Sequence, residues 1–352
     1  MSQLHTSAAP HINSGATTRN VMRDVAIALL PATVVAVILF GLQALLIVLV
    51  SVASAIASEY LFNAVCKKKQ TVFDFSAIVT GLILALNYST KVPLWLCALG
   101  SAFAIIVVKC LFGGLGKNLV NPAAAARVFL LISFAAIVGS GAFPSIGNNE
   151  VTTLKEDGTV EVLQEDVSFF DTAFGKTDTI VVTEYYEDEN GVLKASATPL
   201  GEAGTTNAPS TKDLVLGKIG GTIGEVCVLA LLLGYAYLVL RGVIKWYVPV
   251  AFVGTVFGLF LIRDGFNIAL YQVLAGGLLF GAIFMATDYV TTPLSNLGKV
   301  VFCIGCGLIT FAFRIGFVGG YPEGVSISIV FMNLLTPMIE KWTNPRTLGG
   351  VK

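Results

Sequence analysis

Two asparagines in a glycine-rich stretch have side chains that could recognise a planar polar ligand. The stretch reads GGLGKNLVNPAAAARVF over 113–129 and contains Asn118 and Asn121. Amides three positions apart in a turn or at a helix start can enter one pocket, where they offer donors and acceptors to a planar heterocycle. A helix cap followed by a turn explains the same residues, because Pro122 suits the first position of an Ala-rich helix. A P-loop is excluded, since Leu111 stands where that motif needs Gly and Asn118 where it needs Ser or Thr.

Charged residues inside apolar stretches are candidates for ion pairs or for an ion or proton route. Glu59, Glu225 and Arg314 would be costly in a membrane unless they are paired or face water. A structural Arg–carboxylate pair and an ion route both remain open for them. Asp288 lies among threonines in FMATDYVTTPLSNLGK (284–299), a stretch expected at a membrane surface, and is a further ion-route candidate.

Cys303 and Cys306 have C-x-x-C spacing, but a metal or dithiol site would need further ligands or a redox fold. The pair lies in an apolar stretch without His or a second C-x-x-C. Two thiols on one face of a buried helix behave mainly as small apolar side chains. We therefore expect no metal site here.

The elements that must position these residues are membrane helices. Hydrophobic residues make up 55% of the 352 positions and charged residues only 12%, about half the charge of a soluble domain. The first 20 residues are polar and lack the apolar core of a signal peptide. The composition predicts an all-α polytopic membrane protein.

Ten apolar segments are long enough to be predicted as transmembrane helices. They lie near 25–41, 43–65, 75–90, 93–112, 124–144, 220–240, 244–262, 267–287, 299–319 and 324–340. Between the fifth and sixth segments lies a polar stretch with 14 of the 22 acidic residues. Lys and Arg gather in alternate short loops, which predicts cytoplasmic termini. The predicted divisions are a cytoplasmic arm (1–24), a first five-helix repeat (25–144), an acidic extracytoplasmic loop (145–218), a second five-helix repeat (219–340) and a cytoplasmic C-terminus (341–352).

Five crossings in each half give the halves opposite orientations, which is the geometry of an inverted repeat with sites near its interface. SAIVTGLILAL (76–86) in the third segment is similar to QVLAGGLLFGA (272–282) in the eighth. Helices of small residues that pack closely give a similar pattern. Both explanations of the similarity remain open.

An ordered set of motifs resembles one family of membrane redox proteins. These motifs are PHI (10–12), NVMRDVAIALLPA (20–32), FDFSAIVTGLILAL (73–86), GKNLVNPAAAARVF (116–129), FMATDYVTTP (284–293) and YPEGVSISIVFMNLLTPMIEKW (321–342). They are similar to the D subunit of the Rnf complex, the ion-pumping ferredoxin:NAD⁺ oxidoreductase of bacterial and some archaeal cell membranes. The Rnf D subunit is related to the B subunit of the sodium-pumping NADH:quinone reductase.

The resemblance implies FMN joined by a phosphoester to a threonine on the outer side, where a separate flavin transferase attaches it. Two stretches have a suitable threonine: SGATT (14–18), with Thr17, and ASATPL (195–200), with Thr198. The predicted topology places only Thr198 outside, and Thr-Pro-Leu after Ala is similar to this family's motif. Thr17 is expected to belong to the residues that cap the first helix.

The resemblance also implies a noncovalent riboflavin near the inner side, with contacts at Asn118, Asn121 and Gly81. Electrons would then cross between the outer FMN and the inner riboflavin, coupled to Na⁺ or H⁺ movement. The chain has no nucleotide fingerprint or cluster-ligand set, so NAD and ferredoxin would be handled by partners. The implied partners are the flavinylated G subunit, the A and E membrane subunits, and the cytoplasmic iron–sulfur and NAD-binding subunits.

Two other functions compete with this one. A component like the B subunit of the NADH:quinone reductase would bind a quinone at the N-terminal arm and inner loops. A passive small-solute channel is also possible, because two inverted five-helix halves are similar to the urea-transporter architecture and fold does not fix function. A channel does not need the acidic outer loop with its candidate flavin threonine.

Overall fold

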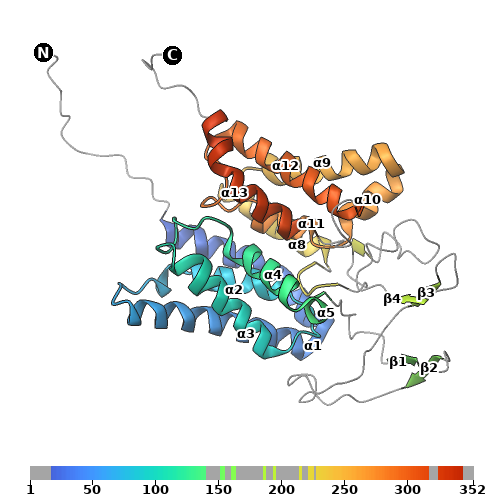
Figure 1. The fold of residues 1–352 in the computed structure, drawn as a ribbon, viewed down its shortest axis with the longest axis horizontal. Helices are drawn as coiled ribbons and strands as arrows, with labels where there is room; N and C mark the ends of the chain where they lie inside the picture. Colours follow the sequence, from blue (N-terminus) through green and yellow to red (C-terminus); the bar gives the residue numbers. More distant parts are fainter. Residues whose placement is uncertain are drawn as a thin grey trace, which may run out of the picture.

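The first half of the protein is a group of packed helices, drawn in blue to green in Figure 1. The computed structural model describes residues 17–139, 214–215, 221–225, 227–316 and 324–343, with the backbone of four short strands between the halves. The first-half elements are α1 (Thr18–Val65), η1 (Val72–Asp74), α2 (Ser76–Leu86), α3 (Leu94–Phe103), the π-helix η2 (Ala104–Cys110), α4 (Pro122–Ser133) and α5 (Ala135–Val138).

The long helix α1 reverses direction at Gly41, whose backbone angles (φ 70°, ψ −154°) are not helical. If α1 were straight, Val21 and Glu59 would be roughly 57 Å apart. Instead, Val21 lines the same cavity as Lys109, and Lys109 bonds Glu59 at 2.9 Å. Glycine adopts a positive φ without strain. The predicted boundary between the first two apolar segments, at 41–43, is therefore confirmed.

The second half, drawn in yellow to red in Figure 1, contains the broken helix of the eighth predicted segment. Its elements are α8 (Val228–Leu240), α9 (Tyr247–Asp264), α10 (Phe266–Leu274), α11 (Leu278–Phe280), the π-helix η4 (Gly281–Met285), α12 (Asn296–Arg314) and α13 (Val325–Thr343). The segment 267–287 was expected to be continuous, but it bends by 64° between α10 and α11. The bend follows from Gly276, which has φ 71°.

Two short antiparallel hairpins lie in the acidic region between the halves. β1 (Val151–Leu154) pairs with β2 (Val160–Leu163), with Val151 opposite Leu163. β3 (Tyr185–Glu187) pairs with β4 (Leu193–Ala195), with Tyr185 opposite Ala195. The described part of each half contains only helices apart from turns and a single bridge residue, as predicted, whereas strands in the 145–218 loop were not predicted.

The two halves are in direct contact at more than one place. α1 packs against α8, and α4 packs against α13. Backbone bonds join Ile223 N to Tyr88 O (2.8 Å) and Gly224 N to Leu86 O (2.7 Å). At the start of α1, Asp24 pairs with Arg241 at 3.1 Å.

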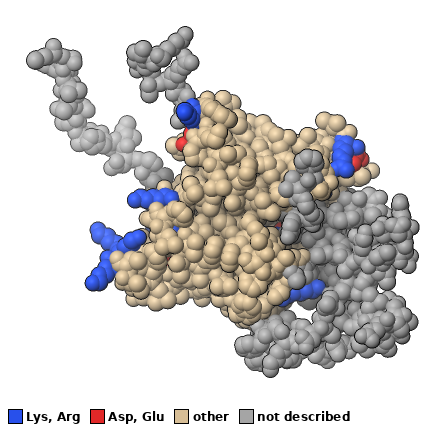
Figure 2. All heavy atoms as spheres, viewed as in Figure 1, with Lys and Arg blue, Asp and Glu red and all other residues tan. Residues whose placement is uncertain are grey.

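The outer surface of the helices is apolar, as expected for a protein in a lipid bilayer. Leu30, Val34 and Ile38 follow each other at intervals of one turn on α1 and are 51%, 55% and 60% exposed. On the face shown in Figure 2, charged side chains gather at the edges and leave a broad uncharged surface.

A helix occupies each of the ten predicted apolar segments. By length and composition, three of the described helices (α1, α9 and α12) could cross a membrane, or four if the bent pair is one span. The apolar helices fit a membrane protein, whereas the total of ten spans and the inverted repeat stay predictions.

Candidate functional site

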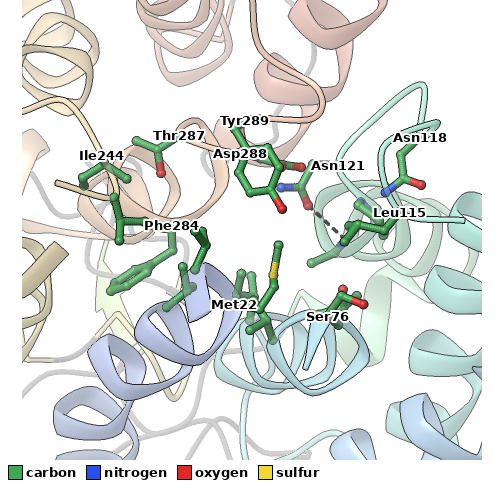
Figure 3. A pocket seen from close by; sticks show the side chains of 18 of the residues that line it. Met22, Ser76, Leu115, Asn118, Asn121, Ile244, Phe284, Thr287, Asp288 and Tyr289 are labelled. Atoms are coloured by element: carbon green, nitrogen blue, oxygen red, sulfur yellow. Dashed lines mark hydrogen bonds between the residues drawn. The ribbon is translucent and has the colours of Figure 1, made fainter. Parts of the chain in front are cut away.

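A cavity lies at the interface between the halves (Figure 3). The space among its lining residues is about 740 Å³ when the solvent at its open mouth is included. The first half contributes the start of α1, one face of α2 and the loop before α4. The second half contributes the end of α8, η4 and the loop after it. The polar lining residues are Ser76, Thr80, Lys109, Asn118, Asn121, Thr287, Asp288 and Tyr289.

Asn118 lines this cavity and has an unsatisfied hydrogen-bond acceptor. Its side chain is only 8% exposed, and its Oδ1 has no hydrogen-bond partner among the described residues. A buried amide oxygen without a partner is costly, and such atoms in native proteins call for a ligand, a water or another explanation. Asn118 is therefore the polar lining residue that most directly calls for a ligand.

Asn121 lies in the same lining but has a structural role. Its Oδ1 accepts hydrogen bonds from Ala123 N (3.0 Å) and Ala124 N (3.1 Å), and so caps α4. Its Nδ2 donates to Met285 O in the other half at 3.3 Å. The sequence left open a ligand amide and a helix cap, and the structure shows the cap for Asn121. Both amides line the one cavity.

Gly81 lies on α2 but is absent from the cavity lining. A Cβ at this position would lie 2.9 Å from the Cα of Val52, so the backbones of α1 and α2 touch here. The observed role of Gly81 is to permit this close packing. Its implied flavin contact stays a prediction.

Lys109, which lines the cavity, belongs to a buried ion pair. The Lys109 ammonium donates to both carboxylate oxygens of Glu59 (2.9 Å each) and to Ser76 Oγ (2.6 Å). Glu59 also accepts a bond from Thr71 Oγ1 at 2.5 Å. Lys109 and Glu59 are each 1% exposed. The sequence analysis did not single out Lys109, although the apolar run before it, AIIVV (104–108), indicates burial.

A second, smaller cavity of about 220 Å³ is lined by Glu225, for which the sequence left open an ion pair or an ion route. Arg127 Nη1 lies 3.4 Å from Glu225 Oε1 and donates to Asn87 Oδ1. Gly277, Met285, Val325 and Ser326 complete the lining. Arg127 belongs to the first half and Glu225 to the second, so this pair also crosses the interface.

Arg314, the third charged residue singled out in the sequence, is partly buried and bonds an amide. Its Nη1 donates to the backbone and side-chain oxygens of Gln272. Lys109 and Arg127 pair with the carboxylates Glu59 and Glu225.

Asp288 lies at the cavity edge in the loop after η4. Its Oδ1 accepts from Val290 N (3.1 Å) and its Oδ2 from Thr291 Oγ1 (3.2 Å). Burial raises the pKa of Asp288, an effect that these two hydrogen bonds oppose. The carboxylate is thus held by neutral donors.

Thr17 and Thr198 differ in what the structure describes. Thr17 Oγ1 accepts from Asn20 N at 3.3 Å and caps α1, which confirms the expected capping role. Thr198 lies outside the described residues. Cys303 and Cys306 are buried in α12, and Cys306 Sγ lies 4.0 Å from Ser328 O. Within the described ranges, no group of three or more His, Cys, Asp or Glu side chains could hold a metal ion.

These observations define a class of protein: a helical membrane protein whose two halves enclose a largely apolar cavity with a few polar groups, as cofactor sites have. The chain belongs to the NQR2, RnfD, RnfE family, which it matches over residues 5–349. The family resemblance inferred from the motifs is therefore confirmed over nearly the whole chain.

Several relatives are similar over almost their full length. The chain is 40% identical to the D subunit of the Na⁺-translocating ferredoxin:NAD⁺ oxidoreductase complex of Acetobacterium woodii, over 99% of this chain and 96% of the relative. It is 33% identical to the D subunit of the proton-translocating ferredoxin:NAD⁺ oxidoreductase complex of Clostridium ljungdahlii, over 97% and 95%. It is also 33% identical to the D subunit of the ion-translocating oxidoreductase complex of Stutzerimonas stutzeri, over 94% and 91%.

Proposed function

We propose that this protein is the D subunit of an ion-translocating ferredoxin:NAD⁺ oxidoreductase complex and that it carries electrons across the membrane. The proposal is supported by family membership and by the names of relatives that align over more than nine-tenths of their length. The single structural observation that carries the redox part is the buried, unpartnered Asn118 Oδ1 in the cavity between the halves. The protein is part of an enzyme, since ferredoxin and NAD⁺ would be bound by partners.

The cavity residues fit a noncovalent riboflavin by their chemistry. Asn118 Oδ1 would accept a hydrogen bond from an N–H of the ring, and its Nδ2 would be a donor. Leu115, Ile283 and Phe284 supply the apolar wall that a planar ring system needs. A bound flavin would supply a centre that accepts one or two electrons. The role of this chain is to hold that ring in a dry, fixed position.

We also propose that Thr198 carries FMN as a phosphoester on the extracytoplasmic side. The support is the ASATPL stretch, its family motif and the predicted position of the 145–218 loop outside. Electrons would pass between this outer FMN and the inner cavity, and would be exchanged outside with the flavinylated G subunit. The A and E membrane subunits and the cytoplasmic iron–sulfur and NAD-binding subunits are the further expected partners.

Electron transfer would be coupled to the movement of Na⁺ or H⁺, with Glu59, Asp288 and Glu225 as candidate route residues. Glu59 is paired with Lys109 and Glu225 with Arg127. Either carboxylate would have to release its partner before it could bind a moving ion. Asp288 needs no such step, because the donors that hold it are neutral.

The cavity assignment is tested by comparing two amides that differ in role. We expect Asn118→Leu to weaken riboflavin binding about tenfold, because a ring N–H loses its acceptor. Its thermal stability should be unchanged or slightly higher, since an unpartnered buried group is removed. Asn121→Leu should instead lower stability by about 0.5–2 kcal/mol, because α4 loses its cap.

Both variants should be made in a Thr198→Ala background, so that noncovalent flavin alone is measured. Affinity is measured by quenching of riboflavin fluorescence, and stability by thermal unfolding in the same detergent. Unchanged riboflavin affinity in Asn118→Leu would contradict the assignment of this cavity. Failure of the parent protein to bind any flavin would favour the solute-channel function.

A further inference from the structure

The flavin cavity contains one cationic and one anionic side chain among its described lining residues, Lys109 and Asp288. Tyr289 is the third titratable group there. Burial, Asp288 and Asp74 raise the pKa of the Tyr289 phenol, in that order of size, so this group stays neutral near pH 8. The charge that a ligand meets is therefore decided by Lys109 and Asp288.

Lys109 has no hydrogen-bonding capacity left for a ligand. An ammonium group has three N–H donors, and those of Lys109 are directed at Glu59 Oε1, Glu59 Oε2 and Ser76 Oγ. The Glu59 carboxylate also compensates its charge at 2.9 Å. A phosphate group in this cavity would find the lysine already neutralised.

Asp288, in contrast to Lys109, has no charged partner that compensates its charge among the described residues. Its carboxylate accepts hydrogen bonds from the Val290 N–H and the Thr291 hydroxyl, both uncharged. No cation within 4.0 Å pairs with it in the described part of the chain, where the ion pairs are formed by other carboxylates. In Figure 3, Asp288 lies with Thr287 and Tyr289 on the second-half side of the cavity, across from Ser76 and Leu115. An uncompensated carboxylate at a partly buried site repels other anions strongly.

We infer that Asp288 is a specificity-determining residue that makes the cavity select an uncharged flavin and reject one that bears a phosphate. This inference rests on the proposed flavin function of the cavity. A monoester phosphate carries close to two negative charges above pH 7, so the Asp288 carboxylate disfavours FMN while it leaves riboflavin unaffected. The same chain can then hold FMN by a covalent link at one site and exclude it from the other.

The test is equilibrium binding of riboflavin and of FMN to the full-length protein in nanodiscs, with Thr198→Ala present and noncovalent flavin removed. The pH is 8, which lies about four units above the ordinary pKa of an aspartate and about two units above the second pKa of a phosphate monoester. We expect riboflavin to bind at least about tenfold more tightly than FMN. Asp288→Asn should raise FMN affinity about tenfold and change riboflavin affinity by less than about threefold. Asp288→Glu, which keeps the charge, should keep the discrimination.

Asparagine retains an oxygen for the Val290 N–H bond, so this variant preserves part of the loop structure. A second measurement uses the unsubstituted cavity alone: raising KCl from about 0.05 to about 1 M should narrow the difference between the two affinities, because salt screens repulsion. Equal binding of FMN and riboflavin at low salt overturns the inference. The inference is also overturned if FMN is still excluded in Asp288→Asn and in high salt, because that result would indicate a steric cause. If neither flavin binds, the proposed function itself fails, and that result is distinct from both.

Discussion

Thr198→Ala is expected to abolish covalent flavin completely when the protein is made together with its flavin transferase. The proposed phosphoester would form on the Thr198 hydroxyl, and alanine has none. The measurement is ultraviolet fluorescence of the protein band in a denaturing gel, where noncovalent flavin is lost. Thr198→Ser retains a hydroxyl and should retain some fluorescence.

Thr17→Ala is the matched control, because SGATT is locally similar to ASATPL. Thr17 caps α1 through Asn20 N, so its loss should cost about 1 kcal/mol of stability and leave gel fluorescence unchanged. Fluorescence that persists in Thr198→Ala would contradict both the attachment site and the predicted topology. Loss of fluorescence in Thr17→Ala would place the attachment on the opposite side.

Lys109→Met is expected to cause a large loss of stability, about 3–5 kcal/mol. The substitution leaves the Glu59 carboxylate in a site where it is 1% exposed, without the ammonium that neutralises it. The double variant Glu59→Leu/Lys109→Met should recover most of the loss, because an apolar pair of similar volume removes both buried charges. The measurement is thermal unfolding of the four proteins of this cycle in one detergent.

Lys69→Met provides the control for loss of a lysine as such. Lys69 is exposed in the loop between α1 and η1, and a substitution there should change stability by less than about 0.5 kcal/mol. Equal effects of Lys69→Met and Lys109→Met would contradict the role given to the buried pair. A double variant less stable than Lys109→Met would show that Glu59 stabilises the fold without its lysine.

The hydropathy of the sequence predicted where helices form. Side chains that face lipid must be apolar, and a membrane-spanning segment forms a helix because the helix pairs all of its own backbone N–H and C=O groups. The reversal at Gly41 follows from the boundary between two apolar segments. The bend near Gly276 was not predicted, although LAGG at 274–277 contains two adjacent glycines. Hydropathy averages over such a short break, so a broken helix and a continuous one give the same signal.

The site was predicted in part. The motif around Asn118 and Asn121 was compatible with a shared pocket and with a helix cap and turn, and the structure places both amides in one cavity lining. The motif could not show which asparagine caps a helix and which contacts a ligand, because both roles use the same amide group. The pairing of Lys109 with Glu59 joins α1 to η2 across many intervening residues, and no local pattern reports such a contact. The sequence predicted Asp288 as a carboxylate at a membrane surface. Only the structure shows that its hydrogen-bond donors are uncharged.

The contacts between the halves also determine whether the connecting peptide is needed to hold the halves together. Bonds from Ile223 to Tyr88 and from Gly224 to Leu86 join the halves beyond the end of α2. The Asp24–Arg241 pair joins them near the start of α1, by the cavity. Because these attachments lie at different depths, a protease cut within 145–218 should leave two fragments that still migrate together under native conditions. The halves could then be expressed as two separate chains and assemble without a continuous backbone.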